Sequence, residues 1–135
     1  MKTTLITGGL GFIGSSICES LLKKKYTNKC ILLDNFGGYM NPIKDSFIDF
    51  RKQRFPSLKN IIIERCDTSN YKALSSIISK YKPNYIYHTA ALPLAKVSNL
   101  NNDEAKISSV DSTVNIIDAI NLLKNSNQKY KFDRF

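Results

Sequence analysis

The sequence contains no tryptophan, one histidine and three cysteines, which is little material for a metal site or a disulfide framework. Cys18, Cys30 and Cys66 are widely spaced, and no two of them form a Cys-x-x-Cys pair. A structural zinc site needs four close Cys or His ligands, and a disulfide-stabilised domain usually has an even number of cysteines. We therefore expect no metal and three reduced, mostly buried thiols.

Long hydrophobic runs are also missing. No segment approaches the roughly 20 apolar residues that a membrane-spanning helix needs. The start of the chain, MKTTLITGGLGFIG, places glycines where a signal peptide has its apolar core. The composition, 42% hydrophobic and 23% charged over 135 residues, is ordinary for one globular domain. These features predict a soluble, cytoplasmic protein with no membrane partner.

Acidic residues are few, with 11 against 20 lysines and arginines, and the formal net charge is +9. A basic protein invites the hypothesis of nucleic-acid binding. The lysines, however, are scattered through the segments LLKKKYTNK, RKQRF, SKYK and KYKFDR, without a stripe or a nucleic-acid motif. We interpret them as a solvated surface and expect no nucleic-acid partner.

Short β-branched runs alternate with longer helical stretches, which is typical of βαβ units around a parallel sheet. The predicted strands cover residues 3–7, 30–34, 60–65 and 84–91, and the predicted helices cover residues 15–25, 44–54, 69–81 and 103–124. The apolar residues that recur every three or four positions in the last helix are Val110, Val114, Ile117, Ile120 and Leu123. The sequence therefore predicts an α/β fold with a doubly wound, Rossmann-type parallel sheet.

Four glycines stand close together in TGGLGFIGS, residues 7–15, between the first predicted strand and the first predicted helix. Glycine loses the most conformational freedom on folding, so such a cluster needs a compensating reason. In a Rossmann unit the backbone turns sharply into a helix whose N-terminal amides donate to a pyrophosphate. The spacing fits that fingerprint in two registers, Gly9-Gly11-Gly14 and Gly8-Gly11-Gly14.

Asp34 ends the second predicted strand, twenty residues after Gly14. A carboxylate at this place accepts hydrogen bonds from the adenosine ribose of a dinucleotide. The next residues, Asn35, Phe36 and Gly37, include no arginine for a 2′-phosphate, so the pattern favours NAD over NADP. Two other interpretations of the glycines are a turn needed only for strand-helix packing and a P-loop, which lacks its Gly-Lys-Ser/Thr here.

Two further polar residues have two interpretations each. Asp67, after the third predicted strand, either meets an adenine amino group or belongs to the N-cap region of the next helix, and the sequence does not separate these. His88 has no second histidine and no paired carboxylate near it in the sequence. We therefore interpret His88 as a packed, hydrogen-bonded residue rather than a catalyst or ligand.

The chain resembles the N-terminal part of the extended short-chain dehydrogenase/reductase enzymes, specifically the NAD-dependent nucleotide-sugar epimerases and dehydratases. TGGLGFIGS is similar to their Thr-Gly-Gly-x-Gly-Phe-Ile-Gly motif, LLDNF to the loop after their second strand, and HTAA to their His-x-Ala-Ala turn. SVDSTVNIIDA resembles their Asn-Val-x-Gly-Thr-x-Asn-Leu-Leu-Glu-Ala helix, with Ser109 in place of the usual Asn and Ser112 in place of the usual Gly. The four motifs lie in register and cover essentially the whole chain.

The resemblance implies NAD as the cofactor and assigns thirteen residues around it. The assigned residues are, for the pyrophosphate, Gly8, Gly11, Phe12, Ile13 and Gly14; for the adenosine ribose, Asp34, Asn35 and Phe36; for adenine, Asp67 and Thr68; and for the nicotinamide half, Ala90, Ala91 and Leu92. Lys96 and Ser98 fall in the loop that reaches toward a sugar substrate in the family.

The family's catalytic Tyr-x-x-x-Lys pair is missing. The residues four positions after the seven tyrosines are Cys30, Ile43, Ser75, Tyr85, Thr89, Ala91 and Arg134. In the family the lysine lowers the pKa of the tyrosine, which then acts as acid or base. We assign no catalytic residue, and the resemblance predicts an NAD-binding domain over residues 1–135, cut before or within its fifth strand and lacking the C-terminal substrate domain.

The implied function is that of the NAD-binding portion of an epimerase or dehydratase, which transiently oxidises C4 of a nucleotide-sugar, here a UDP-sugar. The chain alone is expected to be inactive. The alternative is a non-catalytic dinucleotide-binding or sensing domain, and a flavodoxin-like fold is disfavoured because an FMN phosphate site would not need Asp34. Family members are often dimers, which makes a homodimer a further expectation.

Overall fold

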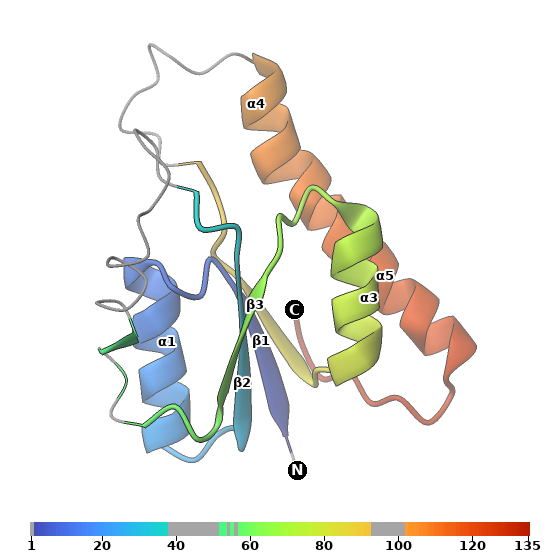
Figure 1. Ribbon diagram of the computed structural model, residues 1–135. Helices are drawn as coiled ribbons and strands as arrows, with labels where there is room; N and C mark the ends of the chain where they lie inside the picture. Colours follow the sequence, from blue (N-terminus) through green and yellow to red (C-terminus); the bar gives the residue numbers. More distant parts are fainter. Residues whose placement is uncertain (1, 38–51, 54, 56, 93–101) are drawn as a thin grey trace.

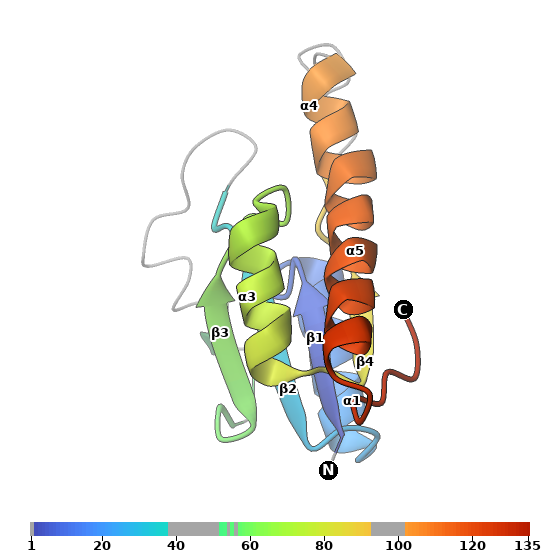
Figure 2. The same cartoon turned by 90° about the vertical axis from the view of Figure 1, so that its right-hand side faces the viewer.

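The computed structural model describes residues 2–37, 52, 53, 55, 57–92 and 102–135. Its centre is a parallel sheet of four strands in the order β3-β2-β1-β4 (Figure 2). The strands are β1 (Thr3–Thr7), β2 (Lys29–Asp34), β3 (Ile61–Arg65) and β4 (Tyr85–His88). All four were predicted, with ends that differ by up to three residues, and the α/β fold with a Rossmann-type sheet is confirmed.

Helices cover both faces of the sheet (Figure 1). Helix α1 (Phe12–Lys23) lies on one face, and α3 (Tyr71–Tyr81) and α5 (Ser112–Ser126) lie on the other. A short helix α4 (Asn102–Lys106) and a π-helical turn η2 (Ile107–Asp111) lead into α5, so the predicted helix over 103–124 is interrupted by a π-turn. The helix predicted over 44–54 lies almost entirely outside the described residues. No described helix is both long and apolar enough to cross a membrane.

Two apolar layers form because successive side chains of a strand point to opposite faces. Leu5 and Ile31 point toward α3 and α5, whereas the neighbouring Ile6 and Leu32 point toward α1. On the α3 side, Leu74 and Ile78 are fully buried. The three cysteines are free and buried in these layers, which confirms that they are packed thiols.

Helix α5 buries only part of the apolar series that the sequence pattern indicated, namely Ile120 and Leu123. The buried residues are Ser112, Ile116, Ala119, Ile120 and Leu123. Val110, Val114 and Ile117 are 54%, 47% and 41% exposed. Steps of three residues turn about 60° short of a full helical turn, so the series that passes from Val114 through Ile117 to Ile120 crosses from one face of the helix to the other. The helix is therefore apolar on two faces.

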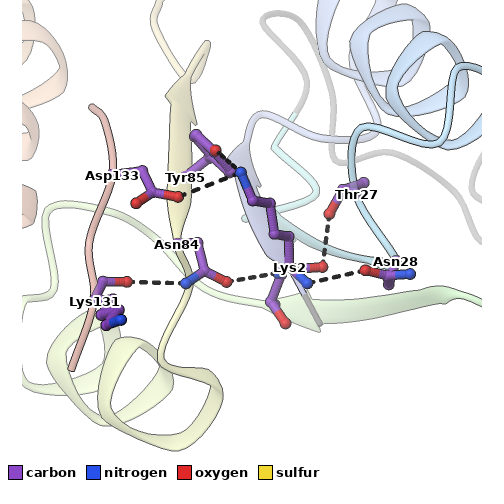
Figure 3. Close-up of polar contacts among 8 residues, drawn as sticks. Lys2, Thr27, Asn28, Asn84, Tyr85, Lys131 and Asp133 are labelled. Atoms are coloured by element: carbon purple, nitrogen blue, oxygen red, sulfur yellow. Dashed lines mark hydrogen bonds and ion pairs between the residues drawn. The ribbon is translucent and has the colours of Figure 1, made fainter. Parts of the chain in front are cut away.

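Asn84 ties the start of β1 to the C-terminal segment (Figure 3). Its side-chain oxygen accepts from the Thr3 amide at 2.9 Å, and its side-chain nitrogen donates to the Lys131 carbonyl at 2.9 Å. Its backbone carbonyl accepts from the Asp133 amide at 2.8 Å. The segment consequently runs beside β4, where Arg134 forms an isolated parallel bridge with Tyr85.

Candidate functional site

A cleft of about 470 Å³ lies at the carboxyl ends of the four strands. In open α/β sheets, ligands bind at this edge because the loops after the strands and the helix N-termini converge there. Ten of the thirteen residues assigned to a cofactor line the cleft, namely Gly8, Gly11, Phe12, Asp34, Asn35, Asp67, Thr68, Ala90, Ala91 and Leu92. The fold therefore brings together residues that are up to 84 positions apart in the sequence.

The glycines of the first loop have different neighbours. Gly8 has a positive φ of 63°, and a Cβ there would lie 2.9 Å from the Ala90 amide nitrogen. A Cβ on Gly9 would lie 2.6 Å from the Leu32 Cβ, and one on Gly14 would lie 2.3 Å from the Gly8 carbonyl oxygen. These three glycines are needed for packing within the chain. Of the two registers, Gly8-Gly11-Gly14 is the one whose first glycine lines the cleft.

Gly11 is the glycine that faces the cleft with the most room around it. A Cβ there would meet one atom within 4 Å, the Gly8 carbonyl oxygen at 3.0 Å. Gly11 is also the N-cap of α1 and contributes no side-chain cap, and the first turn of the helix contains no acidic residue. The first amides of a helix have no intrahelical partner and carry partial positive charge. The loop thus offers amide donors to an anion.

Asp34 is 9% exposed and joins two loops at the edge of the cleft. One carboxylate oxygen accepts from the Leu10 amide at 3.1 Å, and the other accepts from the Phe36 amide at 3.0 Å. Each carboxylate oxygen has two lone pairs, so each retains an acceptor site after these bonds. Asp34 can therefore accept hydroxyl donors from a ligand without giving up its structural contacts.

Asn35 and Asp67 meet on the side of the cleft formed by β2 and β3. The Asn35 side-chain nitrogen donates to Asp67 Oδ2 at 3.0 Å, and the Ser69 amide and hydroxyl donate to Asp67 Oδ1 at 2.9 and 2.7 Å. Burial opposes ionisation of Asp67, but the hydrogen bonds from Asn35 and Ser69 outweigh it and lower the pKa of Asp67. The N-cap of α3 is Asn70, whose side chain accepts from the Ala73 amide at 3.1 Å. Asp67 therefore lines the cleft and also belongs to the turn that leads into the N-cap, although the cap itself is Asn70.

Asn115 of α5 is a positioning residue that the sequence analysis did not identify. Its side-chain nitrogen donates to the carbonyls of Thr68 and Ser69, both at 3.0 Å. Helix α5 thereby holds the loop after β3 at the cleft. The resemblance had placed Asn115 in a family motif without a role, and only its contacts across 46 and 47 residues reveal one.

His88 lies at the end of β4, partly buried and outside the cleft lining. Its Nδ1 is 2.6 Å from the Thr7 hydroxyl, and its Nε2 is 3.2 Å from the Ser112 hydroxyl. Burial lowers the pKa of His88 below its usual 6.5. These contacts confirm the interpretation of His88 as a packed, hydrogen-bonded residue.

Three assigned residues lie beside the cleft rather than in its lining. Ile13 is 63% exposed at the start of α1, and Gly14 is buried against the Gly8 carbonyl. Phe36 has a positive φ of 57°, and its ring lies 5.6 Å from the Arg65 guanidinium. Lys96 and Ser98 lie outside the described residues. The cleft residues that the sequence analysis missed are Leu33, Gly37, Cys66, Thr89 and Ser108.

A model of the GDP-mannose 4,6 dehydratase family matches residues 5–133, which is nearly the whole chain. The chain belongs to this family of NAD-dependent nucleotide-sugar epimerases and dehydratases. In this member of the epimerase/dehydratase family, one cleft is lined by residues of the glycine loop, by Asp34 and by the turn after β4.

Relatives in this family include a UDP-glucose 4-epimerase from Caenorhabditis elegans, which is 33% identical over 90 residues, or 65% of this chain and 25% of that protein. A probable polysaccharide biosynthesis protein from Bacillus subtilis is 29% identical over 90% of this chain and 19% of that protein. The crystal structure of Thermus thermophilus UDP-glucose 4-epimerase in complex with NAD matches with a TM-score of 0.68 and 24% identity over 90% of this chain and 34% of that one. The chain therefore spans between about a fifth and a third of the length of these relatives.

Proposed function

We propose that residues 1–135 are an NAD-binding domain of a nucleotide-sugar epimerase or dehydratase. The observation that carries this proposal is that the glycine loop, the N-terminus of α1 and Asp34 line one cleft. Family membership and the NAD complex of the Thermus thermophilus epimerase support the same cofactor.

The residues at the cleft fit the parts of NAD in a consistent order. The pyrophosphate would accept hydrogen bonds from the amides of Phe12 and Ile13 at the positive end of α1, an end without an acidic residue to repel it. The Gly11 amide donates to the Gly8 carbonyl at 2.9 Å and holds the loop in shape. Asp34 would accept from the adenosine ribose hydroxyls through its remaining lone pairs. The role of Gly14 would be indirect, because its missing side chain lets α1 approach the loop.

The two ends of the cofactor would lie on opposite sides of the sheet's central strands. Adenine would lie against Asn35, Asp67 and Thr68, after β2 and β3. The nicotinamide half would lie along residues 90–92, after β4. Phe36, fixed under the Arg65 guanidinium, would close the ribose side without contacting the pyrophosphate.

NAD is favoured over NADP because of Asp34. A 2′-phosphate at the ribose would bring negative charge next to a carboxylate that already lies at the edge of the cleft. Calorimetric titration of the chain with NAD and NADP tests the proposal. We expect NAD to bind at least about tenfold more tightly than NADP, a difference of about 1.4 kcal/mol. Failure to bind either dinucleotide would remove the basis of the proposal.

Bound NAD would supply a hydride acceptor for transient oxidation of C4 of a nucleotide-sugar, and we propose a UDP-sugar as the substrate class. Lys96 and Ser98 are the proposed substrate contacts. The chain alone is proposed to be inactive, because none of its tyrosines is followed four positions later by lysine. Incubation with NAD and UDP-glucose, followed by chromatography of the sugar nucleotides, should show no conversion.

The absence of the Tyr-x-x-x-Lys pair also favours a second candidate, a non-catalytic dinucleotide-binding or sensing domain. The two candidates differ in their response to a nucleotide-sugar. A domain that contributes to an epimerase site should bind a UDP-sugar weakly and only when NAD is present, whereas a sensor should bind NAD alone. Saturation-transfer NMR with UDP-glucose, with and without NAD, separates them.

We propose a cytoplasmic location and a homodimer for the same chain. Three free, buried thiols are typical of a reducing compartment. The dimer proposal is supported by an exposed apolar stripe on η2 and α5, formed by Ile107, Val110, Val114 and Ile117. A contiguous apolar stripe of this kind is typical of an interaction surface.

A further inference from the structure

Ser112 is fully buried where the π-turn η2 passes into α5. Its amide donates to the carbonyl of Ile107, five residues back, as in a π-helix. In an α-helix the same amide would donate to the carbonyl four residues back, which belongs to Ser108. In this chain the Ser112 hydroxyl donates to the Ser108 carbonyl instead, at 2.6 Å. The side chain thus replaces a bond that the π-turn removes.

The hydroxyl of Ser112 also determines which nitrogen of His88 carries a proton. A serine hydroxyl has one proton, and here it is given to the Ser108 carbonyl. The hydroxyl oxygen can therefore only accept from His88 Nε2, which lies 3.2 Å away. Nε2 is then protonated, and Nδ1 accepts from the Thr7 hydroxyl at 2.6 Å.

The hydrogen bonds of the Thr7 hydroxyl are consistent with this tautomer of His88. The Thr7 hydroxyl oxygen accepts from the amides of Thr89 and Ala90, both at 3.2 Å. Its own proton remains for His88 Nδ1. Every donor in the series consequently has one acceptor, and the imidazole is neutral with its proton on Nε2.

The hydrogen-bond network that runs from Ser108 through Ser112, His88 and Thr7 to Thr89 and Ala90 has both of its ends in the wall of the cleft. Thr89 and Ala90 line it at the end of β4, and Ser108 lines it from η2. The Ser108 hydroxyl donates its proton to the Ala105 carbonyl at 3.3 Å, which leaves the lone pairs of its oxygen available as acceptors. The opposite side of the cleft is held by other contacts, those of Asp34 and Asn115.

We propose that Ser112 is a positioning residue that fixes the π-turn Ile107–Asp111 to the end of β4 through His88 and thereby sets the nicotinamide-side wall of the cleft. The inference rests on the proposed binding of NAD. It concerns a residue at which this chain differs from the family pattern, since glycine, the usual residue, has no hydroxyl to give.

The test compares Ser112→Ala with Thr113→Ala on the 135-residue chain. Thr113 is a matched control, because its hydroxyl makes the same kind of bond, to the Ser109 carbonyl at 2.7 Å. Each variant is titrated with NAD and with AMP by calorimetry. We expect Ser112→Ala to weaken NAD binding about tenfold, the size of one well-placed hydrogen bond, and to leave AMP binding within about twofold of wild type. Thr113→Ala should leave both affinities unchanged.

A second measurement reports on the network without any ligand. Nitrogen-15 NMR of the single histidine should show a neutral ring protonated on Nε2 in the wild type and in Thr113→Ala, and a changed tautomer ratio in Ser112→Ala. If Ser112→Ala does not fold, Ser112→Gly removes the same hydroxyl and carries the same expectations.

The outcomes separate this inference from the function on which it rests. Absence of NAD binding by the wild type would overturn both. NAD binding that Ser112→Ala leaves unchanged would overturn the positioning role alone. Equal weakening of NAD and AMP would also overturn it, because it would show a general loss of structure rather than an effect on one side of the cleft.

Discussion

At the scale of single residues, Gly11 and Gly14 have different roles. Gly14 allows α1 to pack closely against the loop, whereas Gly11 keeps the cleft open. A Cβ on Gly14 would lie 2.3 Å from the Gly8 carbonyl oxygen, whereas one on Gly11 would meet that oxygen at 3.0 Å and little else. We expect Gly14→Ala to lower the free energy of unfolding by at least about 1–3 kcal/mol, because α1 must move away from the loop. Urea denaturation measures this loss.

The matched variant Gly11→Ala should change the free energy of unfolding little and the affinity for NAD strongly. The backbone of Gly11, with φ −69°, accommodates alanine, so we expect a stability loss below about 1 kcal/mol. The added methyl would stand where the pyrophosphate is proposed to lie, and NAD affinity should fall at least about tenfold. If Gly11→Ala bound NAD as well as wild type does, the glycines would be explained by strand-helix packing alone.

At the scale of secondary-structure elements, Asn115 connects α5 to the loop after β3. Asn115→Ala removes two hydrogen bonds, to the carbonyls of Thr68 and Ser69. We expect a loss of about 1–3 kcal/mol in the free energy of unfolding and a several-fold weaker affinity for AMP as well as NAD, since the loop faces the adenine side. Asn121→Ala, at an exposed position of the same helix, serves as the control in the calorimetric titration. Unchanged AMP affinity in Asn115→Ala would contradict the assigned role.

The exposed stripe of η2 and α5 makes a second prediction at this scale. If two copies of the chain associate through the stripe, Val114→Lys should shift the molar mass measured by light scattering from dimer to monomer, because it buries a charge in an apolar contact. Leu122→Lys is the control, since Leu122 is 53% exposed on the same helix but lies off the stripe. A wild-type chain that is monomeric at high concentration would refute the dimer.

At the scale of the whole molecule, the single histidine predicts how stability depends on pH. The ring of His88 lies near the Thr7 and Ser112 hydroxyls and the Phe135 ring. His88 and Arg134 also line one small pocket beside β4. Burial lowers the pKa of His88 in the folded state below 6.5. At pH values between the folded-state pKa and the unfolded-state pKa of His88, the unfolded chain binds more protons than the folded chain. The free energy of unfolding therefore falls as pH decreases through this range.

We therefore expect the melting temperature to decrease from about pH 7.5 to about pH 5.5 and His88→Gln to flatten that slope. A further loss of stability should follow at lower pH, because hydrogen bonds to Glu64 and Asp67 lower the pKa values of both carboxyl groups in the folded state. A His88→Gln variant with the same slope between those pH values would show that another group titrates there.

The sequence by itself determined the elements that local chemistry specifies. Runs such as TTLIT and CILLD are apolar and β-branched enough to form buried strands, and glycine spacing followed by Asp34 placed the loop and the carboxylate correctly at one cleft. These features depend on neighbours within a few residues or on a motif, so they can be read along the chain.

The tertiary structure alone decided the contacts between distant segments. The π-turn before α5, the face that α5 presents to the sheet, and the partners of Asn115 and His88 all depend on how α5 packs over the loops after β3 and β4. Helix α5 is apolar on two faces, so periodicity could not say which one is buried. The bonds of Ser112 exist only because the fold brings β1, β4 and α5 to one point, and no pattern of neighbouring residues encodes that meeting.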